Sequence, residues 1–341
     1  MVSRCGVNFG DPNIYLDRIN PDRGTVSFLP SSLKRLQATI FLDGRSSFAS
    51  DPPVDVEIDR LIVAANHMVV EPRRVIAHMS FCGSTQLARL VDECGAGTVL
   101  KEPHALVDLA DWQRMLREHH SEDPRFTPAV GAVLTILSRR WPGAPPTVIK
   151  PSNWANPVLA KLPMASGDRV LMLTITRRAF LVAAFRGGRD RLTFLARAAS
   201  HFAVSLGQVQ TVDDAISSAA DPLDQAARLV MVAHALQGRL FATLERMSPV
   251  QVARLDYAQI LADPLSALTK ARDHLALDGQ PGKMEAAVRR IASSDAKQAG
   301  AAFSVAAQDA ENQLVEMHQR SRFDETIAWA ASALPEARTW P

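Results

Sequence analysis

Cysteine and long hydrophobic runs are scarce in this chain of 341 residues. The three cysteines, Cys5, Cys82 and Cys94, lack the paired spacing of a metal site, and their odd number argues against a disulfide framework. No apolar segment follows the charged residues at the N-terminus, and the best apolar run, RVLMLTIT, is only as long as a strand. These absences predict a cytoplasmic protein with neither a signal peptide nor a transmembrane segment.

An excess of charge of either sign is also nearly absent, since the formal net charge is only +2 and no Lys/Arg-rich tract occurs. This balance excludes the broad basic surface that nucleic-acid partners require, so any selectivity for anions must be local. The residues are 47% hydrophobic and 22% charged, as in an ordinary globular protein, and we find no repeat or low-complexity tract.

Short apolar runs alternate with longer segments of helical periodicity, which predicts an α/β fold: a parallel sheet flanked by helices on both faces, as a three-layer sandwich. The predicted strands are 73–79, 98–100, 146–150, 168–176 and 252–257. The predicted helices include 103–116, 127–141, 222–247 and 263–277, with another directly after the first strand and ending at Gly95. Residues 1–70 are predicted to be an arm packed on the core, 71–280 the α/β domain, and 281–341 a helical extension of that domain.

A turn of small residues, Cys82-Gly83-Ser84-Thr85, joins the first strand to its helix. Such a turn presents free backbone N–H groups at the positive end of a helix, where an anion binds well. Arg89, one turn further along, could reach the same anion. The pattern lacks the first glycine and the lysine of a nucleotide-triphosphate loop, so it predicts poor binding of ATP phosphates. The alternative is that Ser84 and Thr85 only cap the helix.

Charged and polar side chains follow the next strands where each of them ends. Because carboxyl ends of parallel strands share one edge of a sheet, these groups are expected to form an anion-handling site, although each alone is explained by a solvated edge. The groups are Lys101, Glu102 and His104; Lys150, Ser152 and Asn153; and Arg177, Arg178 and Arg186. His104 alternatively caps or packs its helix, and Trp154 either lines an acceptor pocket or is buried.

Four segments, in this order, resemble the P-loop sulfotransferase superfamily, in its bacterial branch. SFCGSTQLARLVDECG resembles the 5'-phosphosulfate loop, VLKEP the segment after the next strand, TITRRAFLVAAFRGG the 3'-phosphate motif, and RLDYAQILADPLSALTKARDHLAL the strand and helix near the C-terminus. The resemblance covers about residues 73–277. It implies a P-loop-like fold and transfer of sulfonate from 3'-phosphoadenosine 5'-phosphosulfate, without a metal, to a hydroxyl or amine of a small molecule, glycan or peptide.

The resemblance also implies roles for individual residues. Glu102 is implied as the base that takes the acceptor proton, near Lys101 and Lys150, and Arg177 or Arg178 binds the 3'-phosphate, with Arg186 as an alternative cation. The implied loop ligands of the 5'-phosphosulfate are Cys82, Gly83, Ser84, Thr85, Gln86 and Arg89. The implied acceptor side is made by His104, Ser152, Asn153 and Trp154. Asp256 and Tyr257 are assigned to the fold.

One departure from the family pattern concerns the loop cation, because Phe81 stands where relatives carry a basic residue. Arg89, Lys101 or Lys150 could replace that cation, and spacing does not choose among them. This departure keeps open a non-catalytic relative that binds a nucleotide or a partner. A P-loop kinase is less favoured, since the lysine and a magnesium-binding aspartate are missing. A hydrolase that uses Cys82 as a nucleophile of lowered pKa is a further alternative. The sequence does not predict the oligomeric state.

Overall fold

The five predicted strands form one parallel sheet in the computed structural model, which describes residues 6–334 apart from 46–47, 50, 162 and 292–304. They are β4 (Arg74–His78), β5 (Thr98–Lys101), β6 (Thr147–Lys150), β7 (Arg169–Thr174) and β8 (Val252–Asp256), in the order β5-β6-β4-β7-β8. The chain builds β5 and β6 on one side of β4 and then β7 and β8 on the other. The carboxyl end of β4 therefore lies at the switch point where open α/β sheets bind ligands.

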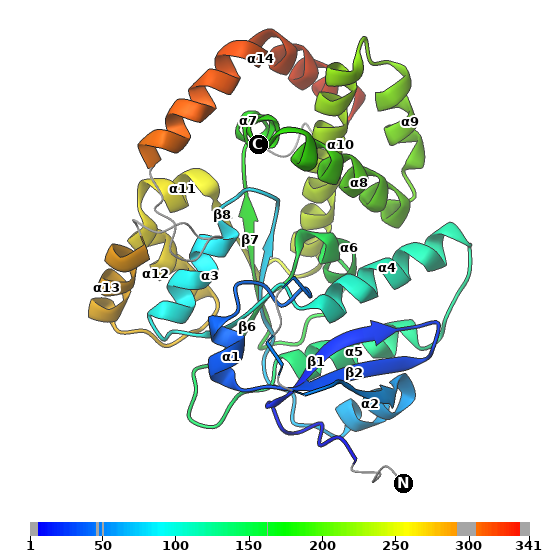
Figure 1. Ribbon diagram of the computed structural model, residues 1–341, viewed down its shortest axis with the longest axis vertical. Helices are drawn as coiled ribbons and strands as arrows, with labels where there is room; N and C mark the ends of the chain where they lie inside the picture. Colours follow the sequence, from blue (N-terminus) through cyan, green and yellow to red (C-terminus); the bar gives the residue numbers. More distant parts are fainter. Residues whose placement is uncertain (1–5, 46–47, 50, 162, 292–304, 335–341) are drawn as a thin grey trace.

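Helices cover both faces of this sheet, which confirms the predicted fold class (Figure 1). On one face lie α3 (Ser84–Glu93), α12 (Pro264–His274) and α13 (Pro281–Ile291), and on the other α6 (Asn156–Leu159) and α10 (Pro222–Met247). The remaining helices of this part are α4 (His104–Glu118), α5 (Phe126–Leu137), a 3₁₀ turn (Asn153–Ala155), α7 (Arg177–Arg186), α8 (Gly188–Leu206), α9 (Val209–Ser217) and α11 (Tyr257–Ala262). α10 is buried along most of its length, so its apolar residues belong to the core.

The N-terminal region contains an antiparallel sheet that the sequence reading missed. It consists of β1 (Ile14–Asn20), β2 (Thr25–Pro30) and β3 (Val54–Glu57), with α1 (Leu33–Ala38) and α2 (Ile58–Asn66) beside it. This sheet packs on α4 and α5. Buried Arg139, just after α5, donates to the carbonyl oxygens of Phe9, Asp11 and Ile14 at 2.6–2.8 Å. These bonds hold the N-terminal strands on the α/β core.

The last described helix, α14 (Val305–Ala333), packs on α7 and α10 beyond the carboxyl edge of the sheet, as Figure 1 shows. A helical C-terminal region was predicted, but its return to the ligand-binding edge was not. Among the described helices, none combines the length and the apolar character needed to span a bilayer.

Candidate functional site

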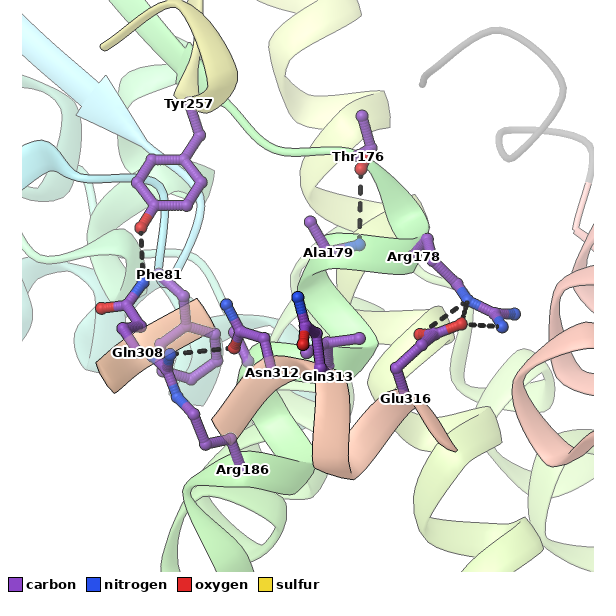
Figure 2. Close-up of a pocket in the computed structure, with 12 residues that line it drawn as sticks. Phe81, Thr176, Arg178, Ala179, Arg186, Tyr257, Gln308, Asn312, Gln313 and Glu316 are labelled. Atoms are coloured by element: carbon purple, nitrogen blue, oxygen red, sulfur yellow. Dashed lines mark hydrogen bonds and ion pairs between the residues drawn. The ribbon is translucent and has the colours of Figure 1, made fainter. Parts of the chain in front are cut away.

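Two adjoining cavities open at the carboxyl edge of the parallel sheet. The first, of about 500 Å³, is lined by the loop before α3 and by the ends of β4, β5 and β6. The second, of about 370 Å³, lies between α7 and α14 (Figure 2). Phe81, Arg186, Tyr257 and Gln308 line both. Their shared wall makes the two cavities neighbouring parts of one candidate site.

The loop between β4 and α3 forms the floor of the first cavity. Gly83 caps the helix in the left-handed region, at φ +76°, and Phe81 has φ +64°, which is costly for a residue with a side chain. The first intrahelical bond runs from Leu87 N to Gly83 O, so the N–H groups of the first turn have no acceptor within the helix. Ser84 and Thr85 are buried and line the cavity with their neighbour Gln86. This arrangement suits an anion.

Tyr257 lies against this loop, although the sequence reading assigned it to the fold. A Cβ at Gly83 would be 3.1 Å from the Tyr257 ring, so only glycine lets the loop pass so closely. The Tyr257 hydroxyl accepts a hydrogen bond from Gln308 Nε2 at 3.2 Å (Figure 2). Asp256, by contrast, caps α11 with Gln259 in a capping box, which confirms the predicted cap. Tyr257 belongs to the wall of both cavities.

Glu102 faces the first cavity and forms an ion pair with Lys150. Its backbone is left-handed, at φ +60°, where β5 turns into α4, and its N–H donates to Lys150 O at 2.6 Å. Lys150 is 1% exposed and lies behind the carboxylate. Burial acts to raise the pKa of Glu102, but the charge of Lys150 and other nearby cations outweigh burial and lower the pKa from its ordinary value. Glu102 is therefore held as an ionised carboxylate at neutral pH.

The segment between α1 and β3 brings further side chains to this carboxylate. Leu42 N donates to Lys101 O at 2.7 Å and His104 N to Leu42 O at 3.0 Å, so the segment follows the edge of β5. As a result Arg45 reaches Glu102 Oε2 at 3.2 Å and stacks 4.0 Å above the Phe41 ring. Phe41 and Arg45 line the first cavity. No motif marked them in the sequence, because their place depends on a contact between distant segments.

Polar side chains from β4 and the turn after β6 complete this end of the cavity. Buried Asn153 donates from Nδ2 to Ser80 Oγ at 3.0 Å and to Gln237 Oε1 at 3.3 Å. Ser152, which was also predicted, lines the cavity and accepts from Trp154 N at 3.4 Å. Burial lowers the pKa of His78, at the end of β4, to about 3, so its ring is neutral. This end of the cavity thus combines fixed polar groups with one ionised carboxylate.

Several predicted residues lie elsewhere. Lys101 binds Gln37 O at 2.7 Å and Asp92 Oδ2 at 3.2 Å, away from the cavity. Trp154 donates to Asp111 Oδ1 at 3.0 Å and stacks on a histidine of α8, and His104 lies 3.7 Å from Asp108 Oδ1. The predicted residues that line neither cavity are Arg89, Lys101, His104, Lys150, Trp154 and Arg177. Those that line the first cavity are Cys82, Gly83, Ser84, Thr85, Gln86, Glu102, Ser152, Asn153 and Arg186.

Cys82 does not fit the role of a nucleophile. Its side chain is 0% exposed, and its Sγ donates to Met79 O at 2.9 Å. Burial raises the pKa of the thiol to about 12, instead of the lowered pKa that the hydrolase alternative needs. That alternative is wrong, because the thiol is buried, donates to a backbone carbonyl and has a raised pKa.

Arg178 lines the second cavity, where α14 surrounds it with acidic groups. Its Nε lies 2.9 Å from Glu316 Oε1, and its Nη1 lies 2.7 Å from Asp324 Oδ1 (Figure 2 shows the first pair). These two carboxylates already use the donors that a 3'-phosphate would need. The second predicted arginine, Arg177, lines neither cavity.

Two other guanidinium groups lie nearer to the loop. Arg186 lines both cavities and donates from Nη1 to Asn312 Oδ1 at 2.9 Å (Figure 2). Arg191, near the start of α8, lines the first cavity, with its guanidinium carbon 5.0 Å from the centre of the Phe81 ring. From the sequence, RGGRDR (186–191) is either a basic loop over the active site or a helix end with solvated arginines, and the number of arginines in it was the available signal.

Comparisons with known proteins place few limits on this site. No family model and no curated protein matches the chain. Among solved structures, it is similar to a sulfotransferase domain from the curacin biosynthetic pathway, at 12% identity and a TM-score of 0.41, over 74% of this chain and 99% of that one. It is also similar to retinol dehydratase in complex with androsterone and the inactive cofactor PAP, at 10% identity and a TM-score of 0.32, over 92% and 96% of the two chains. At these identities and TM-scores, the two structures do not assign a chemistry to this site, and only its own residues indicate one.

Proposed function

We propose that this chain is a sulfotransferase-like enzyme that moves a sulfonate from 3'-phosphoadenosine 5'-phosphosulfate to a hydroxyl or amine acceptor. The observation that carries the proposal is the first cavity, in which the N-terminus of α3 and the carboxylate of Glu102, paired with Lys150 behind it, face the same space. Transfer of this kind needs a held anion and a base on opposite sides of one reacting centre.

The residues present fit such a donor. Thr85 is only 6% exposed and lines the cavity beside Ser84 and Gln86. Together with the free N–H groups of α3, it offers donors to a 5'-phosphosulfate. Arg186, which lines both cavities, is the best-placed cation for a 3'-phosphate, because its ion pair with Glu311, at 4.0 Å, is longer than the two ion pairs that hold Arg178. When bound, the donor supplies the activated sulfonyl group.

On the acceptor side, Glu102 is the proposed base. Its lowered pKa keeps it ionised at neutral pH, so that it accepts a hydrogen bond from the acceptor hydroxyl or amine and then its proton. Lys150 and Arg45 hold the carboxylate from behind and from the side. Phe41 and Phe194 line the same cavity and supply an apolar surface for the body of the acceptor.

A second candidate is a nucleotide-binding protein without turnover. Phe81 in the loop favours it, because an aromatic ring cannot neutralise the phosphate that departs in the reaction. The two candidates differ in turnover and agree in donor binding.

The first test is calorimetric titration of the protein with 3',5'-adenosine bisphosphate, AMP and ATP, without metal. We expect the bisphosphate to bind most tightly, because only it places phosphates on both the loop and Arg186. Arg186→Met should remove this preference, while Arg177→Met, at a residue that lines neither cavity, should keep it. If the bisphosphate binds no better than AMP, the proposed donor is wrong.

Release of 3',5'-adenosine bisphosphate from the donor, in the presence of phenols, alcohols and amines, separates the two candidates. Turnover supports the enzyme. Selective binding with no release from any acceptor class supports the binding protein.

A further inference from the structure

The loop before α3 has no basic residue of its own, and none of the three cations that the sequence offered reaches it. Lys101 is bound to Asp92, Lys150 lies behind Glu102, and Arg89 lines neither cavity. We infer that Arg191, from α8, completes the anion site on this loop and holds the 5'-phosphosulfate together with the α3 N–H groups and the Thr85 hydroxyl. This inference rests on the proposed function and names the cation of its donor site.

Arg191 lies over the aromatic ring of Phe81, a residue of the loop itself. Its guanidinium carbon lies 5.0 Å from the centre of the Phe81 ring, which in turn packs 5.7 Å from the ring of Phe180. Phe81 therefore acts as a platform for a charge carried by another element. An arginine stacked on an aromatic ring keeps the edges of its planar guanidinium free for hydrogen bonds.

Arg191 uses few of its N–H donors for contacts within the described part of the protein. Its Nη1 donates to Ala183 O at 2.8 Å, and within the described residues no carboxylate forms an ion pair with it. A guanidinium has five N–H donors, so most of its donors are still available to a ligand. The half-buried side chain lines the first cavity together with the residues of the loop.

The turn between α7 and α8 is shaped around this side chain. A Cβ at Gly187 would lie 1.8 Å from Arg191 Cδ, so any other residue there would push the arginine from its place. The next residue, Gly188, has φ +64°. The two glycines let the Arg191 side chain fold back over the turn toward Phe81.

Two further observations point to an anionic ligand at this place. Arg186 lines the same cavity, and burial followed by the charge of Arg186 lowers the pKa of Arg191, with Glu311 acting in the opposite direction without outweighing them. An anion between the two guanidinium groups would relieve their repulsion. Thr85, which is 6% exposed, lines the same cavity with its hydroxyl-bearing neighbour Ser84.

The test compares wild type with Arg191→Met, which keeps an unbranched side chain and removes the charge, by titration with AMP, 3',5'-adenosine bisphosphate and inorganic pyrophosphate. We expect Arg191→Met to weaken binding of AMP and of the bisphosphate about ten- to hundredfold, as for loss of a charged hydrogen bond. Arg191→Lys should keep part of the affinity. Arg189→Met is the matched control, because Arg189 is exposed on the same helix and lines neither cavity.

Phe81→Lys in the Arg191→Met background is the second variant, since it places a cation in the loop itself. Recovery of AMP affinity supports the inference independently of any change in folding. If Arg191→Met binds AMP and the bisphosphate as wild type does, the inference is wrong, while preference for the bisphosphate over AMP still supports the proposed function.

If wild type binds neither nucleotide, the proposed donor is wrong and pyrophosphate decides the inference. Binding of pyrophosphate that depends on Arg191 keeps the anion site, and absence of that dependence overturns it.

Discussion

At the scale of single residues, the ionised carboxylate of Glu102 and the buried ammonium of Lys150 define the reactive end of the site. Their ion pair has a cost for catalysis, because a carboxylate of lowered pKa is a weak base. The gain is that Glu102 is deprotonated across the neutral range. Its contribution should therefore be constant at neutral pH and decline only in acid.

Glu102→Gln should lower turnover about 10²- to 10⁴-fold, because the amide cannot take the acceptor proton. Donor affinity should be unchanged, since Glu102 lies on the acceptor side. The measurement is the release of 3',5'-adenosine bisphosphate, with calorimetric affinity of the same variant as the control. In wild type, activity should be lost only as pH falls through the lowered pKa of Glu102. A loss of activity between pH 8 and pH 6 would contradict this role.

Asp168→Ala should destabilise the protein by about 3–5 kcal/mol, because it leaves a largely buried guanidinium without its partner. Asp168 is 1% exposed and accepts from Arg73 N and Nε and from Ala165 N, each at 2.8 Å. Chemical denaturation measures the loss. Glu118→Ala, which removes a partly exposed i,i+4 pair with Arg114, should cost at most about 0.5 kcal/mol. Equal costs would mean that the Arg73–Asp168 pair does not anchor the starts of β4 and β7.

At the scale of elements, α14 forms one wall of the second cavity, the proposed donor end of the site. It supplies Gln308, Asn312 and Glu316 to the second cavity. Glu316 and Asp324 neutralise Arg178, which would otherwise add a cation there. The helix thus both closes the cavity and sets its charge.

Glu316→Gln with Asp324→Asn should strengthen binding of 3',5'-adenosine bisphosphate about three- to tenfold, because it frees Arg178 and removes two negative charges near the 3'-phosphate. AMP, which has no 3'-phosphate, should bind unchanged and serves as the internal control. Calorimetry measures both. If both nucleotides gain equally, the charges act on the whole cavity and not on a 3'-phosphate.

The elements also show what the sequence could predict. All five strands of the parallel sheet were predicted because buried strands are continuous apolar runs. The hairpin of β1 and β2 was missed although the NPDRG turn between two β-branched runs signals it. The loop, Glu102 and Arg186 were predicted from positions at strand ends. Arg45, Arg191 and Gln308 reach the cavity only through packing between distant segments, which no local pattern encodes.

At the scale of the whole molecule, buried histidines tie the fold to pH. Burial lowers the pKa of His201 and of His234 to about 4, and of His78 to about 3, from an ordinary value of 6.5. Each accepts a proton more readily in the unfolded chain than in the folded one. Between pH 6.5 and these lowered values, the unfolded state therefore binds more protons.

The free energy of unfolding should be steady above about pH 6.5 and fall as pH drops toward 4, by roughly 1.4 kcal/mol per pH unit for each such histidine. Urea denaturation at pH 7.5, 6 and 5 measures this slope. His234→Gln should reduce the slope by the share of one histidine, even if it lowers stability at every pH. His119→Gln, at an exposed position, should leave the slope unchanged. A slope that His234→Gln does not alter would contradict the assignment.

The place of α14 over the second cavity has a consequence for how the protein is made. The anion loop emerges from the ribosome with residues 81–85, whereas Gln308 and Asn312 follow more than 200 residues later. A nascent or C-terminally shortened chain can carry the loop without the wall that closes the donor site. Under the proposed function, stabilisation by bound nucleotide is then available only to chains that include α14, so that nucleotide in the cell would protect those chains from proteolysis and leave truncated ones exposed.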